Sequence, residues 1–346
     1  MMTTSYISSL SLWNLPRSAS GRLQAEIANA TKEIADGRYA DVGLAIGGQV
    51  GRSLSLRQSA AEIAALKDGN GLTASRINAS QANLQQMQKA ADARLATLTG
   101  LPADQRVAAM AASADDTLAT LTGLLNATSN GQSLFSGTNT GASPIRDGAA
   151  AAAKTNAVAA FQSAFGFPPS DARTADLTAA QIQGFLEGTV AAQFADPNWG
   201  TTWSQASSTA ITSRISLTET VTTSVGANET AFRQLAEAAL VSSLGMTGLS
   251  AEAQAVVSNR AMSLLSKGSA GLVSLQADLG RAQARITDAN TRLDAQSALV
   301  TKEIAGLEAV DPAEAKTRLN AATTQLQMSY SLTAQLQGLS LLKYIS

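Results

Sequence analysis

The sequence predicts a mainly helical protein in which both ends of the chain build one antiparallel coiled coil, with a small α+β domain inserted between them. Two segments far apart in the sequence carry apolar residues at every seventh position, and the composition between them changes sharply. A seven-residue repeat places side chains along one stripe of a helix, and that stripe leaves water only by packing on another helix. The repeats comprise Leu56, Ile63, Asn70, Ile77, Leu84, Ala91 and Leu98 in the first segment, and Ile286, Leu293, Val300 and Leu307 in the second.

The first 40 residues are predicted to be helical, with different apolar faces before and after Pro16. Tyr6, Leu10 and Trp13 share the first face, and the second face comprises Leu23, Ile27, Ala30 and Ile34. An amphipathic helix this short is only marginally stable alone in water, because nucleation is costly and most helical stability comes from packing. We therefore expect this segment to become ordered against a partner.

Glycines separate this segment from the first heptad repeat. Residues 37–51 contain five glycines, each of which costs a helix interior about 0.5 to 1 kcal/mol relative to alanine, so we predict a loop or hinge. Further helices are predicted over 52–99 and 103–130. Asn70 occupies a core position of the heptad helix. It is either buried, where it would fix the register of the pairing, or exposed because Gly69 and Gly71 interrupt the helix.

The composition changes near residue 141. Between there and residue 203 lie four of the seven prolines, five of the seven phenylalanines and two of the three tryptophans. We predict that residues 141–226 form a separate inserted domain. Thr178, three residues before Gln181, predicts a capped helix, and alternating apolar residues after 210 predict a strand or hairpin. The residues expected to face inward are Ile182, Phe185 and Leu186 in the helix, and Ile211, Ile215, Leu217, Val221 and Val225 in the strands.

Two tryptophans of this segment allow two interpretations. Trp199 and Trp203 lie one helical turn apart in sequence. A small domain needs aromatic side chains for its core, whereas exposed tryptophans can stack on sugars. The first interpretation gives a structural role, and the second gives a glycan-binding platform.

The helical pattern returns at residue 227 and continues to the end of the chain. Asp311, Pro312 and Glu314 predict the start of the last helix, because they supply a cap, a proline suited to the first turn and an acid that can close a capping box. That helix is apolar on two nearly opposite faces, and one amino-terminal helix can cover only one of them. Other subunits are expected to cover the second face. The predicted assembly interface comprises Tyr6, Leu10, Trp13, Leu23, Ile27, Met328, Leu332, Leu336, Leu339, Leu342 and Ile345.

Charged residues flank the second heptad repeat. Arg281 and Arg285 are both spaced to pair with Asp288 on the polar side of the predicted helix. Exposed pairs of this kind contribute only tenths of a kcal/mol, so they are expected to align the helices more than to strengthen them.

The composition argues against several classes of function. The 346 residues carry a net charge of −1, with 25 basic and 26 acidic side chains and no dense basic stretch, so nucleic acid is not an expected partner. The chain contains no histidine and no cysteine, which removes most metal sites and the common nucleophilic triads. No secretory signal pattern and no run of about 18 apolar residues occurs, so membrane insertion is not expected. We predict no catalytic, cofactor-binding or metal-binding residue.

Two short motifs resemble chemical sites without meeting their requirements. The glycines between Gly43 and Gly51 match neither of the common phosphate-binding spacings. Asp115 and Asp116 are neighbours on a predicted helix, where adjacent side chains point about 100° apart and cannot converge on one metal ion. We interpret the first as a hinge and the second as part of a solvated face.

Four segments, in this order along the chain, resemble the flagellin superfamily. KEIADGRYADVGLAIGGQVGRSLSLR (32–57) is similar to the turn after the first helix of flagellin-like proteins, and LFSGTNT (134–140) to the end of their amino-terminal core. VGANETAFRQL (225–235) resembles the return to the carboxyl-terminal core. QLQGLSLLKYI (335–345) is similar to the tail of the L-type hook-associated proteins, which join the hook to the filament. The resemblance covers residues 5–140 and 227–346.

Two departures from the filament flagellins favour the junction branch of the superfamily. Filament flagellins usually carry a paired-Asp stretch after the first helix, which GRYADVG lacks, and a polar tail rich in Gln and Asn, whereas this chain ends in SLLKYIS. The resemblance therefore implies a hook–filament junction subunit. Filament flagellin is the first alternative, and a flagellin-like glycan-binding surface protein is the second.

The resemblance also implies an organisation, a location and partners. The terminal helices, 1–45 and 308–346, would be disordered in the monomer and fold on assembly into an inner tube. Residues 46–140 and 227–307 would form the coiled-coil core, and 141–226 would face outward. The chain would be secreted through the flagellar type III channel with an export chaperone, and it would join the extracellular flagellum. Its partners would be the hook-side junction protein, filament flagellin, and further copies of itself in a ring or tube.

Overall fold

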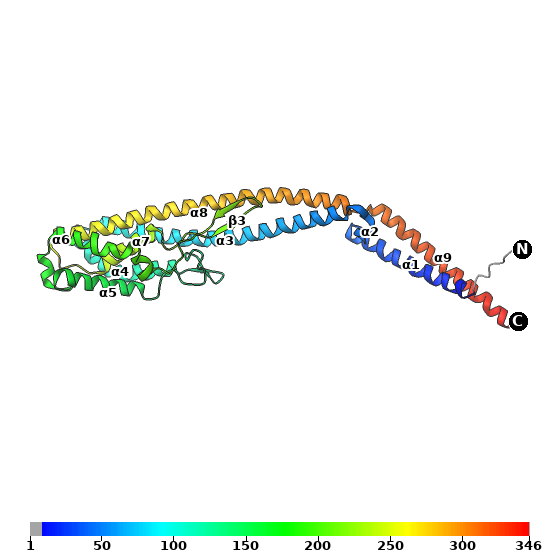
Figure 1. Ribbon diagram of the computed structural model, residues 1–346, viewed down its shortest axis with the longest axis horizontal. Coiled ribbons are helices and arrows are strands. Elements are labelled where there is room, and N and C mark those ends of the chain that lie inside the picture. Colours follow the sequence, from blue (N-terminus) through cyan, green and yellow to red (C-terminus); the bar gives the residue numbers. More distant parts are fainter. Residues whose placement is uncertain (1–8, 346) are drawn as a thin grey trace. The chain divides into compact units, whose positions relative to one another are not determined.

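The computed structural model describes the backbone of residues 9–345 and the side chains of residues 18–335, and it is mainly helical (Figure 1). The α-helices are α1 (Ser9–Asp36), α2 (Val42–Ile46), α3 (Val50–Gly100), α4 (Ala103–Leu125), α5 (Ala149–Phe165), α6 (Ala179–Gly184), α7 (Thr230–Ser243), α8 (Ala251–Glu308) and α9 (Pro312–Ile345). The strands form two short antiparallel hairpins, β1 (Thr128–Ser129) with β2 (Gln132–Ser133), and β3 (Thr212–Arg214) with β4 (Thr220–Thr222). This content confirms the predicted fold class.

The described residues form two compact units. One comprises the residues up to Ala65 together with those from Leu293 onward, and the other comprises Leu66–Arg292. The long helices α3 and α8 each contribute to both units. The division into terminal, core and inserted domains suggested by the sequence stays a prediction.

Helices α3 and α8 run antiparallel, and the heptad repeats form their contact. Three side-chain hydrogen bonds show the direction: they join Asn70 to Asn290, Gln88 to Gln276 and Asp92 to Ser269. Residue numbers rise along α3 as those of their partners fall along α8. From Ile63 to Leu98 all six repeat positions are buried, as are Ile286 and Leu293. Leu56, Val300 and Leu307 are half-buried. The predicted pairing of the heptad segments is confirmed in direction and in its buried stripe.

The glycines beside Asn70 do not break the helix. Helix α3 continues through Gly69 and Gly71, and Asn70 is 1% exposed. Because the pairing with α8 supplies the stability that two glycines remove, tertiary packing overrides local propensity here. Of the two interpretations of Asn70, the buried one is correct.

The segment predicted as a loop over 37–51 is only partly a loop. It contains α2 and a short 3₁₀ turn (Gly47–Gln49) before α3 begins at Val50. Asp41 caps α2 by accepting a hydrogen bond from the Leu44 amide at 2.9 Å. The glycines are used at the edges of these turns, where Gly37 and Gly47 adopt positive φ angles of 67° and 52°. Positions that break a helix interior can therefore end and restart helices within a few residues.

The predicted third helix ends five residues early. Helix α4 stops at Leu125, and the β1–β2 hairpin follows directly. Its turn is Asn130–Gly131, with φ angles of 50° and 75°. This hairpin was not predicted from the sequence, although an Asn-Gly pair is the strongest local signal for a two-residue turn.

Residues 141–226 contribute to the same hydrophobic core as α3, α4, α7 and α8. Thr178 and Gln181 form the predicted capping box, and the three inward-facing residues of that helix are buried, although its second half, Phe185–Val190, is π-helical. Of the predicted strand residues, Ile215, Val221 and Val225 are buried and Ile211 is half-buried. Leu217 was predicted to face inward and is 47% exposed, because it lies in the turn between β3 and β4.

Helices α7 and α8 approach closely at two glycines. A Cβ on Gly271 would lie 2.7 Å from the Ala231 Cβ, and a Cβ on Gly268 would lie 2.6 Å from a methyl carbon of Leu235. These separations are shorter than any normal carbon contact, so a methyl group on Gly271 requires the two helices to move apart, and one on Gly268 requires the Leu235 side chain to shift.

We expect Gly271→Ala to lower the free energy of unfolding by about 1 to 3 kcal/mol, because the overlap with Ala231 outweighs the gain in helix propensity. Gly306→Ala in the same helix is the matched control, since nothing lies within 4 Å of its added Cβ, and it should stabilise the protein by about 0.5 to 1 kcal/mol. Urea unfolding followed by circular dichroism measures both. Equal shifts in the two variants would contradict the close approach.

Candidate assembly interface

Helices α1 and α9 lie side by side and pack against each other (Figure 1). On α1, Leu23 and Ile27 are half-buried. On α9, Ala315 and Ala322 are fully buried. Small residues on α9 let the two helices approach closely.

Two large apolar side chains on the other side of α9 are exposed within the described residues. Met328 is 54% exposed and Leu332 is 58% exposed. These two side chains are spaced four residues apart, so they lie next to each other on one face of the helix.

The structure places only some residues of the predicted interface. Tyr6 lies outside the described residues. Other predicted residues belong to α1 or α9, but their side chains lie outside the described part of the chain; these are Leu10, Trp13, Leu336, Leu339, Leu342 and Ile345. Of the residues that can be placed, Leu23 and Ile27 lie on the side of α1 that packs on α9, and Met328 and Leu332 lie on the exposed side of α9. The interface as a whole stays a prediction.

Two buried carboxylates lie near the end of the α1–α9 pair at which α1 stops and α9 begins. Glu33 accepts hydrogen bonds from the Ala40 amide at 3.1 Å and from Arg318 at 2.7 Å. Glu308 accepts from Ser53 and forms a close ion pair with Arg57. A buried carboxylate is tolerated when its oxygens are paired in this way.

Two backbone hydrogen bonds also lie at this end of the α1–α9 pair. The Tyr39 amide donates to the Glu308 carbonyl oxygen at 3.1 Å, and the Val310 amide donates to the Gly37 carbonyl oxygen at 3.2 Å. Two strand-like contacts thus tie the end of α1 to the connection between α8 and α9. The roles of Glu33 and Glu308 were not predicted, because a glutamate in an amphipathic helix gives no local sign of burial.

Acidic pH is expected to weaken the contacts at this end of the α1–α9 pair. The Arg57 guanidinium, by its hydrogen bond, holds the pKa of the Glu308 carboxyl below its ordinary value of 4.5. An acid whose pKa is lowered by folding stabilises the native state above its ordinary pKa, and that stability is lost as the pH falls through the folded-state pKa. The loss should therefore begin below pH 4.5.

Hydrogen exchange of the Tyr39 and Val310 amides measures this effect locally. Protection of both amides should be constant above that pH and fall below it. In Glu308→Gln, protection should already be lower at neutral pH, by about 1 to 3 kcal/mol of opening free energy, and should depend less on pH. Protection that falls equally in both proteins on acidification would assign the acid sensitivity to another group.

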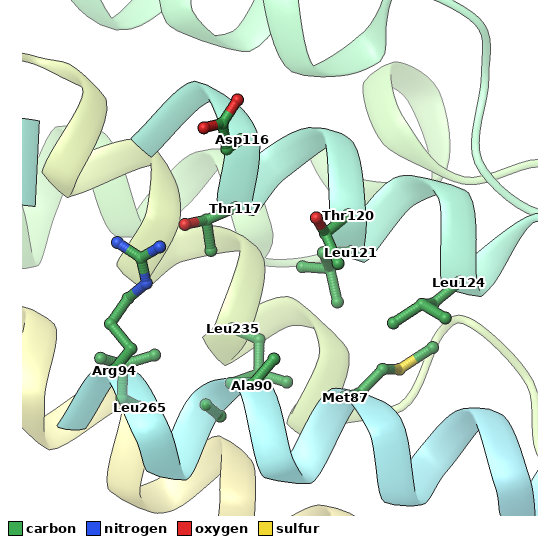
Figure 2. Close-up of a pocket in the computed structure, with 11 residues that line it drawn as sticks. Met87, Ala90, Arg94, Asp116, Thr117, Thr120, Leu121, Leu124, Leu235 and Leu265 are labelled. Atoms are coloured by element: carbon green, nitrogen blue, oxygen red, sulfur yellow. The ribbon is translucent and has the colours of Figure 1, made fainter. Parts of the chain in front are cut away.

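The unit formed by Leu66–Arg292 contains a small hollow between α3 and α4, shown in Figure 2. Its volume is about 130 Å³, and its walls are mainly apolar. The charged side chains at its edge are Arg94 and Asp116. Arg94 is already bonded to the side chain and carbonyl oxygen of Ser113. The hollow offers no pair of convergent acids and no nucleophile beside a base, so it lacks the groups that acid–base or covalent catalysis requires.

The described residues contain no candidate metal site. In that part of the chain, no group of three or more acidic side chains is placed to hold a metal ion. Asp115 pairs with Lys154 at 2.8 Å and is largely exposed, in keeping with a solvated face. Within the same described range, no helix is long and apolar enough to cross a membrane.

The tryptophans do not form an exposed sugar-binding platform. Trp199 and Trp203 are each 1% exposed, and their rings stack with centroids 5.4 Å apart. The Trp199 ring nitrogen donates to Asn228 at 3.1 Å. The glycan-binding alternative, which required both rings on the surface, is therefore wrong in that form, and the core interpretation is correct.

Comparisons with known proteins match both helical ends of the chain. Residues 7–140 match the family model of the bacterial flagellin N-terminal helical region, and residues 262–345 match that of the bacterial flagellin C-terminal helical region. Together these regions cover more than half of the chain. No curated protein matches the sequence significantly. The two matched regions contain α1 and α9, α3, α4 and most of α8.

Proposed function

This chain belongs to the bacterial flagellin family, and on that premise we propose that it is the subunit that joins the flagellar hook to the filament. The family is structural and non-enzymatic, its members self-assemble, and they are exported to form the extracellular flagellum. The chain is therefore a structural component of the bacterial flagellum. The proposal concerns which component it is and which residues assemble it.

The uncovered apolar face of α9 is the observation that carries the assembly role. Met328 and Leu332 are apolar and exposed to water. Burying each side chain against another subunit would contribute roughly 1.5 to 3 kcal/mol to the free energy of assembly. We propose that this face continues along the helix through Leu336, Leu339, Leu342 and Ile345. With Tyr6, Leu10 and Trp13 from the amino-terminal end, these residues would form the subunit contact.

Two features support the junction subunit over filament flagellin. The segment after the first helix carries one aspartate, Asp41, in place of a paired-Asp stretch, and the structure uses it to cap α2. The tail ends in the apolar sequence SLLKYIS. We propose the hook-side junction protein and filament flagellin as the partners, with an export chaperone that covers the terminal segments before assembly.

Filament flagellin remains the second candidate, because both matched regions are described as flagellin. The two functions require the same coiled coil and the same apolar termini. They differ in whether the subunit adds to itself without limit.

Seeded assembly separates these candidates. The purified chain is added to isolated filament fragments and to isolated hooks, and growth is followed by negative-stain electron microscopy. The junction subunit should stay monomeric in solution and bind hook ends as a short ring. Long tubes that grow from filament seeds would overturn the junction proposal in favour of filament flagellin.

A further inference from the structure

The β3–β4 hairpin contacts both long helices of the Leu66–Arg292 unit. On one side, the Ile215 carbonyl oxygen accepts a hydrogen bond from the Asn70 amide nitrogen of α3 at 3.0 Å. On the other side, Glu219 accepts from Arg285 and from Arg292 of α8, each at 2.9 Å. The hairpin therefore bridges α3 and α8 through named polar contacts.

The partners of these arginines differ from the sequence expectation. Asp288 was expected to pair with Arg281 and Arg285. Instead, Arg281 pairs with Asp278 of the same helix, and Arg285 pairs with Glu219. Both predicted pairs were wrong: the acid that pairs with Arg281 lies three residues earlier in the same helix, and the acid that pairs with Arg285 comes from the hairpin, which a search along one helix does not include.

Asn70 links the hairpin to the coiled-coil core. Its side-chain nitrogen donates to Ile215 and also to the Asn290 side-chain oxygen at 2.7 Å, and the residue is 1% exposed. A buried asparagine disfavours helix pairings that leave its side-chain NH₂ group without an acceptor. Here one acceptor belongs to α8 and the other to the hairpin.

The stripes of α8 do not select one pairing by themselves. Its buried apolar stripe repeats every seven residues through Leu272, Leu279 and Ile286. The residues that hydrogen-bond to α3 also repeat every seven positions, as Ser269, Gln276, Gln283 and Asn290. A shift of one heptad would replace aliphatic residues by aliphatic residues and polar residues by polar residues, so the helix pair alone penalises it weakly.

The hairpin distinguishes the native pairing of α3 and α8 from the pairing shifted by one heptad. Arg285 and Arg292 are themselves one heptad apart, and Glu219 binds both, which fixes the hairpin at one position along α8. From that position, Ile215 can accept from Asn70 in one register only. We infer that the β3–β4 hairpin is a register key, which sets the pairing of α3 with α8 by binding Asn70 on one helix and the Arg285/Arg292 pair on the other.

Thiol crosslinking can test the register, because the natural chain contains no cysteine. Asn78→Cys with Gln283→Cys reports the native pairing, since these two side chains hydrogen-bond at 2.9 Å. Asn78→Cys with Gln276→Cys reports a pairing shifted by one heptad, and it leaves Asn70 and its acceptor Asn290 unchanged. One heptad is about 10 Å along a helix, so a short bifunctional thiol reagent distinguishes the two pairs.

The key is removed by Asn70→Leu with Glu219→Ala. The shifted pair should then crosslink about tenfold more than in the native background. Leu217→Ala, in the exposed turn of the same hairpin, is the matched control and should leave the shifted crosslink at background. Circular dichroism checks that each variant remains helical.

Two outcomes would overturn the inference. The first is that only the native pair crosslinks in the helical double variant, which would mean that the rest of the core fixes the register. The second outcome concerns the single variant. If the double variant loses helicity, Glu219→Ala alone is compared with Leu217→Ala. A shifted crosslink no higher in Glu219→Ala than in Leu217→Ala also overturns the proposal, and a clear excess supports it.

Discussion

Gly137→Ala is expected to destabilise the Leu66–Arg292 unit by about 2 to 5 kcal/mol, because the added methyl group meets backbone strain and steric overlap together. Gly137 has a φ angle of 60°, and a Cβ at this position would lie 2.5 Å from the Ser207 carbonyl oxygen and 2.7 Å from the Thr209 carbonyl oxygen. Both the backbone conformation and the available space therefore oppose a side chain.

The surrounding backbone cannot easily move to relieve this overlap. The Ser207 amide donates to the Ser136 carbonyl oxygen at 2.9 Å, and the Thr138 amide donates to the Thr209 carbonyl oxygen at 3.1 Å. These bonds hold residues 136–138, which include Gly137, against residues 207–209. The contact gives a physical reason for the glycine in the LFSGTNT segment.

Urea unfolding at neutral pH measures this effect. Gly141→Ala is the matched control, because it lies in the same loop and nothing is found within 4 Å of its added Cβ. The control should change the midpoint little, whereas Gly137→Ala should lower it strongly or yield no folded protein. Similar midpoints for the two variants would show that the close approach at Gly137 does not constrain the fold.

The second large effect is expected from charges on the exposed face of α9. Met328→Asp with Leu332→Asp should prevent assembly, because two buried aspartates replace two apolar contacts of roughly 1.5 to 3 kcal/mol each. The loss corresponds to a rise of roughly a hundredfold or more in the concentration needed for assembly. Deleting residues 332–346 should have the same effect while the Leu66–Arg292 unit remains folded.

Sedimentation and seeded electron microscopy measure this prediction. Ser331→Asp adds a charge to the same turn at an exposed polar position and is the control for a general charge effect. Proteolysis and circular dichroism establish that the Leu66–Arg292 unit is intact. Normal assembly of the double variant or of the truncation would exclude the α9 face as the subunit contact.

The sequence predicted the parts of this fold that rest on repeated local signals. The heptad stripes, the capping box at Thr178 and the start of α9 at Pro312 each depend on side chains a few residues apart, and the structure places them as expected. It left open whether Asn70 is buried or is exposed beside Gly69 and Gly71, because burial at this position depends on packing against α8 from about 200 residues away.

The candidate interface shows the same division. A second apolar face on α9 could be predicted from spacing, and the two of its residues that the structure describes, Met328 and Leu332, are exposed. The buried carboxylates Glu33 and Glu308 could not, because burial of a charge depends on partners from other segments, such as Arg318 and Arg57. Contacts between distant segments decide these cases, and a single sequence does not reveal them.

The ion pair between Glu33 and Arg318 joins residues 285 positions apart in the chain. Contacts of such long separation form late in folding, since the intervening chain must first be organised. A ribosome that has translated only the first 300 residues has made Glu33 but not its partner. The α1–α9 pair therefore cannot form on an incomplete chain, and only a chain translated through α9 can present the apolar face that this helix carries.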